Sequence, residues 1–127
     1  MSNTVKISKT LKPFKKSLSI EGDKSISIRW ALLASQASGK SRSYNLLNSE
    51  DVMNTLKCLK KLGIKIKSTK KFCEIRSKGL NSFKLKKKIQ LDAGNSGTLG
   101  RLLMGLLVHT RSKIKMLGDN SLSKRDF

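Results

Sequence analysis

The chain has 127 residues, the length of one domain, and a formal net charge of +20. One proline and nine glycines exclude collagen-like and low-complexity classes. No apolar run approaches the ~20 residues of a membrane span, and residues 1–14 lack the apolar stretch of a secretory signal. Two isolated cysteines are too few for a disulfide framework, so we expect a soluble, cytoplasmic protein.

The positive charge suggests nucleic acid, because lysine and arginine neutralise phosphates. Lysine, however, supplies 22 of the 28 basic residues, and aromatic residues make up only 5%. Arginine forks and aromatic rings carry much of the recognition of bases. Lysines also alternate with apolar residues at 64–67 and 83–86, the pattern of a half-solvated strand. We therefore expect solvent-facing lysines rather than a nucleic-acid interface. The positive electrostatic field of the chain would also attract a small anionic substrate.

The first predicted element is a strand over 16–20, which leads into a polar turn, Gly-Asp-Lys-Ser, at 22–25. A helix is expected over 26–37. Because this helix is apolar on almost all sides, it is predicted to be buried. A strand over 43–47 follows it.

The next segment, 50–62, has apolar residues at helical spacing and lysines on the other side. Ser49 is the expected N-cap of this helix and Gly63 its stop. The remaining predicted elements are strands over 64–68, 72–77 and 89–91, a second all-apolar helix over 99–108, and a strand over 113–117.

The order of elements begins again in the second half of the chain. A shift of 71 residues places Ser25 on Ser96 and superposes the two apolar helices. Each copy reads strand, small polar turn, buried helix, strand. The second copy stops at Phe127 before its amphipathic helix, and a repeated unit buries its face against its neighbours. We therefore expect 127 residues to be part of a longer domain.

The turn at 22–25 is the first candidate for an anion site. Free N–H groups at a helix start favour anions, and Arg29 lies one helical turn beyond Ser25. Lys24, the Ser25 hydroxyl and Arg29 are placed to converge on one phosphate or carboxylate. The alternative is structural: Gly22 makes the turn, Ser25 caps the helix and Arg29 lies on the surface.

A second turn, Gly-Asn-Ser-Gly-Thr at 94–98, is followed by Arg101. Two glycines let a backbone pass close to a ligand, and a helix again begins beside them. The alternative is an ordinary glycine-rich connection between a strand and a helix. Because both repeat copies place small polar residues at this corner, the pattern favours a shared anion site.

The segment 34–41 fits a loose phosphate-loop pattern, but a helix precedes it and a strand follows, the reverse of what the mechanism requires. We therefore exclude an NTPase and interpret Gly39 as a helix C-cap. His109 is expected at a helix end, and Cys58 and Cys73 are expected to pack in the interior. The eight carboxylates form no metal-ligand pattern, so neither a metal nor a cofactor is predicted.

Four blocks of sequence, taken together, are similar to one known family. Residues 22–29 with the apolar helix after them, 45–55, 91–101 and 118–125 resemble the opening of EPSP synthases, the 5-enolpyruvylshikimate-3-phosphate synthases. The blocks occur in the family's order over nearly the whole chain, which makes the combination specific. The resemblance implies an α/β fold built from repeated βαβαββ units, the inside-out α/β barrel of enolpyruvyl transferases, incomplete here.

The resemblance also implies an organisation of the chain. Residues 1–15 would belong to the other domain of the full enzyme, 16–88 would form the first βαβαββ unit, and 89–127 would begin a truncated second unit. The family's acid and base residues are expected beyond Phe127, so no catalytic residue is assigned within this chain, and the chain alone is expected to be inactive. Asp126 stands where the family usually has a proline after Arg125.

The family moves the enolpyruvyl group of phosphoenolpyruvate to the 5-hydroxyl of shikimate 3-phosphate and releases phosphate, a step toward chorismate and the aromatic amino acids. The resemblance implies these substrate-binding roles: Lys24 for both substrates, Ser25 and Arg29 for shikimate 3-phosphate, Gly97 for close backbone approach of phosphoenolpyruvate, Arg125 for its phosphate or carboxylate, and Asn95 and Arg101 in support. Both substrates are polyanions, which suits lysine, arginine and helix starts. The full enzyme is expected to be a monomer without cofactors, and this chain to need a complementing one.

Two alternatives stay open at this stage. The enolpyruvyl transferase of peptidoglycan synthesis shares the fold, but its turn usually reads Lys-Asn, so Ser25 and Arg29 argue against it. A small basic nucleic-acid-binding protein is the alternative from another class, and salt-dependent binding of DNA or RNA would favour it.

Overall fold

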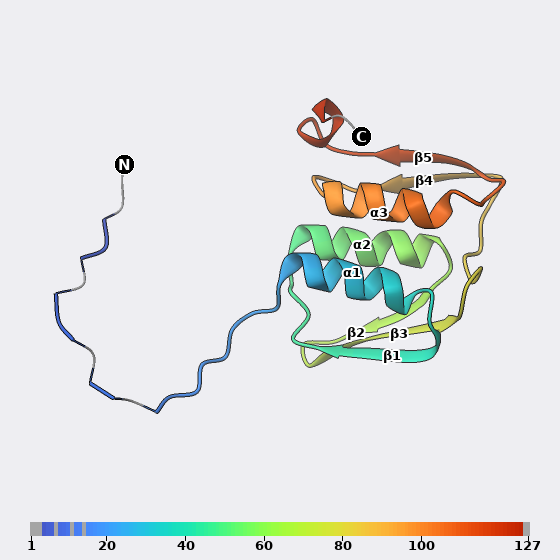
Figure 1. Cartoon of the computed structure of the whole chain (residues 1–127). Helices are drawn as coiled ribbons and strands as arrows, with labels where there is room; N and C mark the ends of the chain where they lie inside the picture. The colour runs from blue at the N-terminus through green and yellow to red at the C-terminus, as the bar shows by residue number, and fades with distance from the viewer. Residues whose placement is uncertain (1–3, 7, 11, 14, 126–127) are drawn as a thin grey trace.

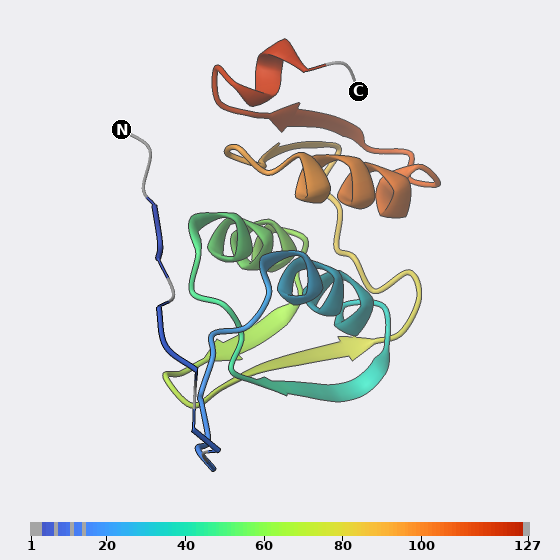
Figure 2. The same cartoon turned by 60° about the vertical axis from the view of Figure 1, so that its left-hand side comes forward.

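The computed structural model describes residues 4–6, 8–10, 12–13 and 15–125. In this part of the chain, three α-helices lie between a three-stranded sheet on one side and a two-stranded sheet on the other (Figures 1 and 2). None of these helices is long and apolar enough to cross a membrane. In chain order the elements are α1 (Lys24–Ala34), β1 (Ser38–Tyr44), α2 (Glu50–Lys61), β2 (Lys65–Ser68), β3 (Phe72–Lys78), β4 (Lys88–Asp92), α3 (Gly97–Leu107), β5 (Lys113–Leu117) and the 3-10 helix η1 (Leu122–Lys124).

The three-stranded sheet is antiparallel with the order β1-β3-β2. Its central strand β3 alternates in burial: Cys73, Ile75 and Ser77 are buried, whereas Arg76 is exposed. The alternation arises because successive side chains of a strand point to opposite faces. The flanking strand β2 likewise exposes its lysines on either side of Ile66, which confirms the predicted pattern of apolar residues inward and lysines outward.

The second lysine-rich segment, 83–86, alternates in burial but forms no strand. Phe83 and Leu85 pack partly against the core, and the backbone N–H of Lys84 donates to the carbonyl oxygen of Leu62 at 2.8 Å. Its alternation therefore reflects burial of every second side chain along a connecting segment, and the expectation of a half-solvated strand there is wrong.

The two-stranded sheet is parallel, and α3 connects its strands β4 and β5. Leu91 lies opposite Met116 in this register. On α3, Leu99, Leu103 and Leu107 recur every fourth residue and are buried along one stripe, as a helix packed on one face requires. The predicted helix and both predicted strands of this half are confirmed, with β4 and α3 beginning slightly earlier than expected.

The amphipathic helix α2 begins after Ser49 and ends before Gly63, as predicted. Gly63 has φ +84°, the left-handed conformation that commonly ends a helix. The Cys58 thiol of α2 donates to the carbonyl oxygen of Asp92 at 3.2 Å, which ties α2 to the end of β4. Cys58 and Cys73 are both buried, as expected of packing residues, and burial raises the pKa of each thiol.

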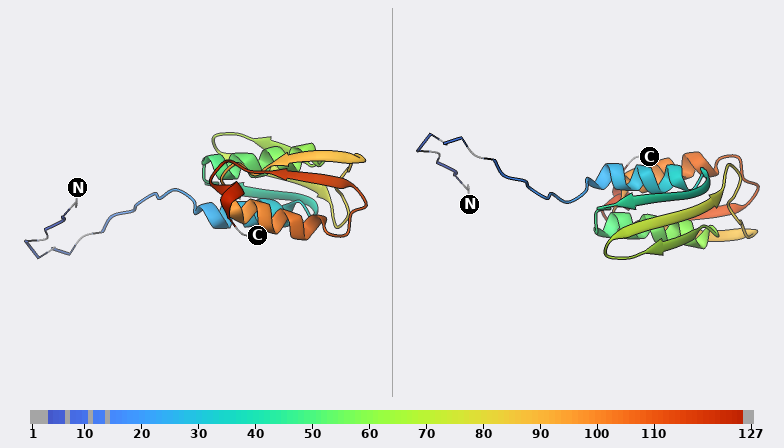
Figure 3. Two further views of the ribbon diagram at one scale, coloured as in Figure 1. Left: turned by 90° about the horizontal axis from the view of Figure 1, so that it is seen from above. Right: turned by 90° about the horizontal axis from the view of Figure 1, so that it is seen from below.

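The predicted strand over 16–20 is wrong. These residues are exposed and extended, and the chain before α1 runs away from the body of the molecule (Figure 3). A strand needs a neighbour for its backbone hydrogen bonds, and no described strand pairs with this segment. A hydrogen bond joins it to the turn after β1: Nδ2 of Asn45 donates to the carbonyl oxygen of Ile20 at 2.7 Å.

The strand predicted over 43–47 lies earlier in the chain, as β1. It pairs with β3 along its whole length and ends at Tyr44, because the backbone turns at Asn45, where φ is 57°. Gly39, with φ +95°, lies inside β1 and is not the C-cap of α1; that cap is Ser35. Segment 34–41 nevertheless connects a helix to a strand, which confirms the reversed order that excludes a phosphate loop.

The repeat is visible in the core. The same shift of 71 residues places Ile28 on Leu99 and Leu32 on Leu103, and all four are buried. The expectation that α1 is buried all round is wrong, because Leu33 on its other side is 69% exposed. In the described part of the chain, each apolar helix packs through one face.

Gly22 lies so close to the end of β1 that any side chain would disturb it. A Cβ there would overlap the carbonyl oxygen of Asn45 and lie 3.2 Å from the amide nitrogen of Leu47. We expect Gly22→Ala to lower the free energy of unfolding by about 1–3 kcal/mol, measured by urea denaturation. Gly105→Ala is the control: nothing lies within 4 Å of a Cβ there, and alanine favours helix by up to ~1 kcal/mol. Equal effects of the two substitutions would contradict the close approach.

The helix starts offer a second matched pair. Asp23 caps α1, because its Oδ1 accepts from the backbone N–H of Ile26 at 2.7 Å. Ser49 occupies the same position before α2, but its buried hydroxyl has no hydrogen-bond partner. We expect Asp23→Ala to destabilise the chain by about 1 kcal/mol and Ser49→Ala to change stability little, in thermal denaturation monitored by circular dichroism. A larger loss for Ser49→Ala would show that Ser49 is the functional cap.

Candidate functional site

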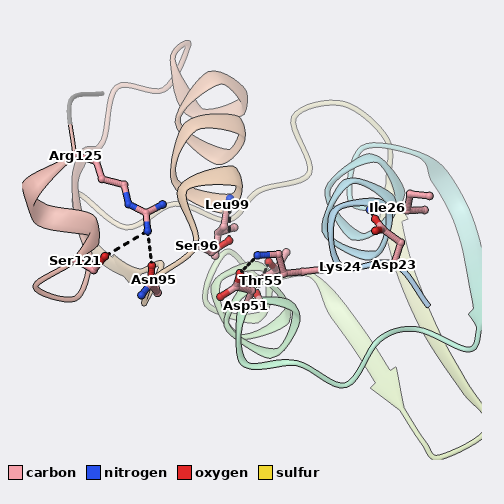
Figure 4. A network of polar contacts seen from close by, with 10 residues as sticks. All are labelled: Asp23, Lys24, Ile26, Asp51, Thr55, Asn95, Ser96, Leu99, Ser121 and Arg125. Atoms are coloured by element: carbon pink, nitrogen blue, oxygen red, sulfur yellow. Dashed lines mark hydrogen bonds and ion pairs between the residues drawn. The ribbon is translucent and has the colours of Figure 1, made fainter. Parts of the chain in front are cut away.

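The starts of α1, α2 and α3 lie around one cavity of about 370 Å³ (Figure 4). Each helix contributes residues from its first turn, and the loop before α3 and the segment after η1 complete the wall. The lining residues are Lys24, Asp51, Asn95, Ser96, Gly97, Thr98 and Arg125. The backbone N–H groups at a helix start have no partner within the helix, so a cavity bounded by three such starts favours an anion.

A second cavity, of about 400 Å³, adjoins the first. The two share Gly97, Thr98 and Arg125, and the second extends along the exposed side of α1 and α3. Its lining residues are Arg29, Gly97, Thr98, Arg101, Leu102 and Arg125. Three arginines from α1, α3 and the segment after η1 therefore face a single space, an arrangement that suits a phosphate or a carboxylate.

Capping fixes where α1 and α3 begin. Asp23 caps α1, so the helix starts at Lys24; the sequence-based alternative that Ser25 caps it is wrong. The hydroxyl of buried Ser96 accepts from the backbone N–H of Leu99 at 3.3 Å and caps α3, so that helix starts at Gly97. These two caps place Lys24 and Gly97 in the wall of the first cavity.

Arg125 is held by neutral partners. Its Nη2 donates to Oδ1 of Asn95 at 2.9 Å and to the hydroxyl of Ser121 at 3.3 Å (Figure 4). The turn before it is fixed by Asp119, whose Oδ1 accepts from the N–H of Leu122 at 2.7 Å. These hydrogen bonds orient the guanidinium without neutralising it, so its positive charge is directed at the cavities.

Two glycines shape the loop and the start of α3. Gly94 has φ +56°, a conformation that favours glycine, and a Cβ there would displace the side-chain amide of Asn54. A Cβ on Gly97 would lie 3.5 Å from Nη1 of Arg125, an ordinary contact, but it would project into the space that both cavities share. Gly97 thus adds no side chain to the cavity wall, and the close backbone approach of a ligand there stays a prediction.

Six of the seven predicted substrate-binding residues line these cavities, whereas Ser25 lines neither. The convergence predicted for the first turn is therefore only partly observed: Lys24 lines the first cavity and Arg29 the second. The departure at Asp126 lies outside the described residues. Among those described, no group of three or more His, Cys, Asp or Glu side chains is placed to hold a metal ion, and His109 is exposed just after α3.

Asp51 lies at this site although no role was predicted for it from the sequence. Its Oδ2 lies 3.0 Å from Nζ of Lys24, and within the described part of the chain it is the only acidic residue that lines the two cavities. Its place in the first turn of α2 is readable from the sequence, because acidic residues favour helix starts. Its pairing with Lys24 could not be predicted from the sequence, because the ion pair depends on how α1 and α2 pack.

Comparison with known proteins finds relatives over most of the chain. Residues 8–126 match the family model of EPSP synthase (3-phosphoshikimate 1-carboxyvinyltransferase). The 3-phosphoshikimate 1-carboxyvinyltransferase of Streptococcus mutans is 44% identical over 108 residues, which are 85% of this chain and 25% of that protein. The enzyme of the same name from Syntrophomonas wolfei is 39% identical over 120 residues, 94% of this chain and 28% of that protein.

A solved structure of EPSP synthase from Acinetobacter baumannii superposes with a TM-score of 0.78 at 34% identity, covering 85% of this chain and 24% of that one. The chain thus spans about a quarter of the length of the curated relatives that it matches. The match of sequence extends over nearly all of its residues, and the match of structure confirms the expected α/β fold. The chain belongs to the EPSP synthase family.

Proposed function

We propose that this chain supplies part of the substrate site of an enolpyruvyl transferase. That enzyme moves the enolpyruvyl group of phosphoenolpyruvate to the 5-hydroxyl of shikimate 3-phosphate and releases phosphate. The observation that carries the proposal is the convergence of four cations on two adjoining cavities at helix starts: Lys24, Arg29, Arg101 and Arg125. The name shared by the relatives, 3-phosphoshikimate 1-carboxyvinyltransferase, supports it.

The two cavities suit two polyanionic substrates bound side by side. Arg29 faces the second cavity, where it would hold shikimate 3-phosphate. Arg125 faces both, so it would pair with the phosphate or carboxylate of phosphoenolpyruvate where the two ligands meet. Ser25 follows Lys24 on α1 without lining either cavity, and its contact with shikimate 3-phosphate stays a prediction.

The proposal includes the division of the chain into units. Residues 16–88 would form one unit and 89–127 would begin the next, with 1–15 outside both. The coincidence of buried positions in α1 and α3 supports this division, as does the βαβ arrangement of β4, α3 and β5. The site would then lie at the corner where the two units meet.

Binding of shikimate 3-phosphate tests the proposal directly. We expect Arg29→Ala to weaken its binding to the 127-residue chain roughly tenfold, because a hydrogen bond to a charged group is lost, as measured by isothermal titration calorimetry. The matched control is Arg111→Ala, which removes the same charge from an exposed position between α3 and β5, outside both cavities. Equal weakening by both variants would reduce the effect to net charge and contradict the proposed site.

The chain alone is expected not to turn over its substrates. Proton transfer during addition and elimination needs an acid and a base, and the one acidic residue that lines the cavities in the described part of the chain is engaged with Lys24. Incubation with phosphoenolpyruvate and shikimate 3-phosphate should release no phosphate above the background without protein. Phosphate release that disappears in Arg125→Ala would overturn this expectation.

A further inference from the structure

A carboxylate lies in the wall of a cavity otherwise suited to anions. Among the residues that the structure describes, Asp51 is the only acidic one lining the two cavities, beside Lys24, Arg29, Arg101 and Arg125. Its side chain is 17% exposed, so its charge is only partly screened by solvent. A negative charge there repels an anionic ligand, and that cost calls for a compensating role.

The ion pair between Asp51 and Lys24 provides such a role. Oδ2 of Asp51 lies 3.0 Å from Nζ of Lys24, close enough for an ion pair with a hydrogen bond (Figure 4). Lys24 is the first residue of α1, and its side chain is 53% exposed. A lysine in that position has four rotatable carbon bonds and, without a partner, samples many directions in solvent.

Asp51 is itself well fixed. It lies in the first turn of α2, and the hydroxyl of buried Thr55 donates to its backbone carbonyl oxygen at 2.9 Å. Because α1 and α2 pack against each other through the core, the backbone that carries the carboxylate is held in place relative to the start of α1. The pair thus joins the starts of two helices at the cavity wall.

We infer that Asp51 is a positioning residue: its carboxylate holds the Lys24 ammonium at the cavity wall before any ligand binds. The inference rests on the proposed function, since it treats Lys24 as a ligand-binding cation. A phosphate-bearing ligand then meets an ammonium already in place, and the rotamer entropy of Lys24 is not lost during binding. Asp51 acts through Lys24 and touches no reacting atom.

The test asks whether removing the charge of Asp51 weakens or tightens ligand binding. Weaker binding indicates that Asp51 positions Lys24, and tighter binding indicates that Asp51 only repels the ligand. Asp51→Asn should weaken binding of shikimate 3-phosphate roughly threefold while Lys24 is present, the scale of a partly exposed ion pair. In the Lys24→Ala background the same substitution should leave binding unchanged or tighten it, because only the repulsive charge is then removed. Tighter binding with Lys24 present, or the same weakening in both backgrounds, would overturn the inference.

Glu50→Gln is the matched control. Glu50 precedes Asp51 in the same first turn, so the variant removes the same charge from the same helix start, but it lines neither cavity. It should leave binding of shikimate 3-phosphate close to that of the unmodified chain. Should Asp51→Asn fail to fold, Asp51→Ser is the second variant, because serine is favoured near helix starts. A loss of affinity in Glu50→Gln equal to that in Asp51→Asn would contradict positioning.

A ligand-free measurement decides the inference even if the proposed function fails. Nitrogen-15 relaxation of the lysine ammonium groups, with Lys24 assigned from Lys24→Ala, should show Lys24 restrained in the unmodified chain and in Glu50→Gln, and mobile in Asp51→Asn. Asp51→Glu keeps the carboxylate and should keep most of the restraint. Equal mobility of Lys24 in all four proteins would overturn the inference. Absence of any binding of shikimate 3-phosphate or phosphoenolpyruvate to the unmodified chain would contradict the proposed function instead.

Discussion

Packing of the three helices against one another, between the two sheets, brings together the helix starts that line the cavities (Figure 2). Ile28, Leu59 and Leu99, one from each helix, are fully buried in a single core. Because that core aligns the helices with their starts together, residues distant in the chain share one space at that end. The polar groups of the site depend on this alignment, since no single element supplies more than two of the four cations.

Local patterns predicted the elements whose neighbours lie within the described chain. The helical spacing of 50–62 and the alternation in β2 and β3 were sufficient, because burial on one face is what those patterns report. The prediction of a strand over 16–20 was wrong, because a strand also needs a partner and none of the described strands pairs with this segment. The position of β1 was missed, because its extent depends on pairing with β3 and on the turn at Asn45.

For the site, the turns at 22–25 and 94–98 were predictable, because glycine and small polar residues before an apolar helix mark a helix start. The individual roles came from the family resemblance, and they stay predictions. The Lys24–Asp51 pair was not predictable, because it depends on the packing of α1 on α2. The contacts of the other charged residues likewise depend on the fold: on the first sheet Arg42 pairs with half-buried Glu74 and lowers the pKa of that carboxyl, and neither residue lines the two cavities.

The two buried cysteines allow the opening of two separate parts of the fold to be followed by thiol labelling. A buried thiol with a raised pKa reacts slowly with alkylating reagents, so its modification waits for the surrounding structure to open. Cys58 lies against the end of β4, so its labelling rate would record separation of α2 from the second sheet. Cys73 lies in β3, so its rate would record opening of the first sheet. The chain therefore carries one native probe of local opening for each sheet, and no cysteine has to be introduced.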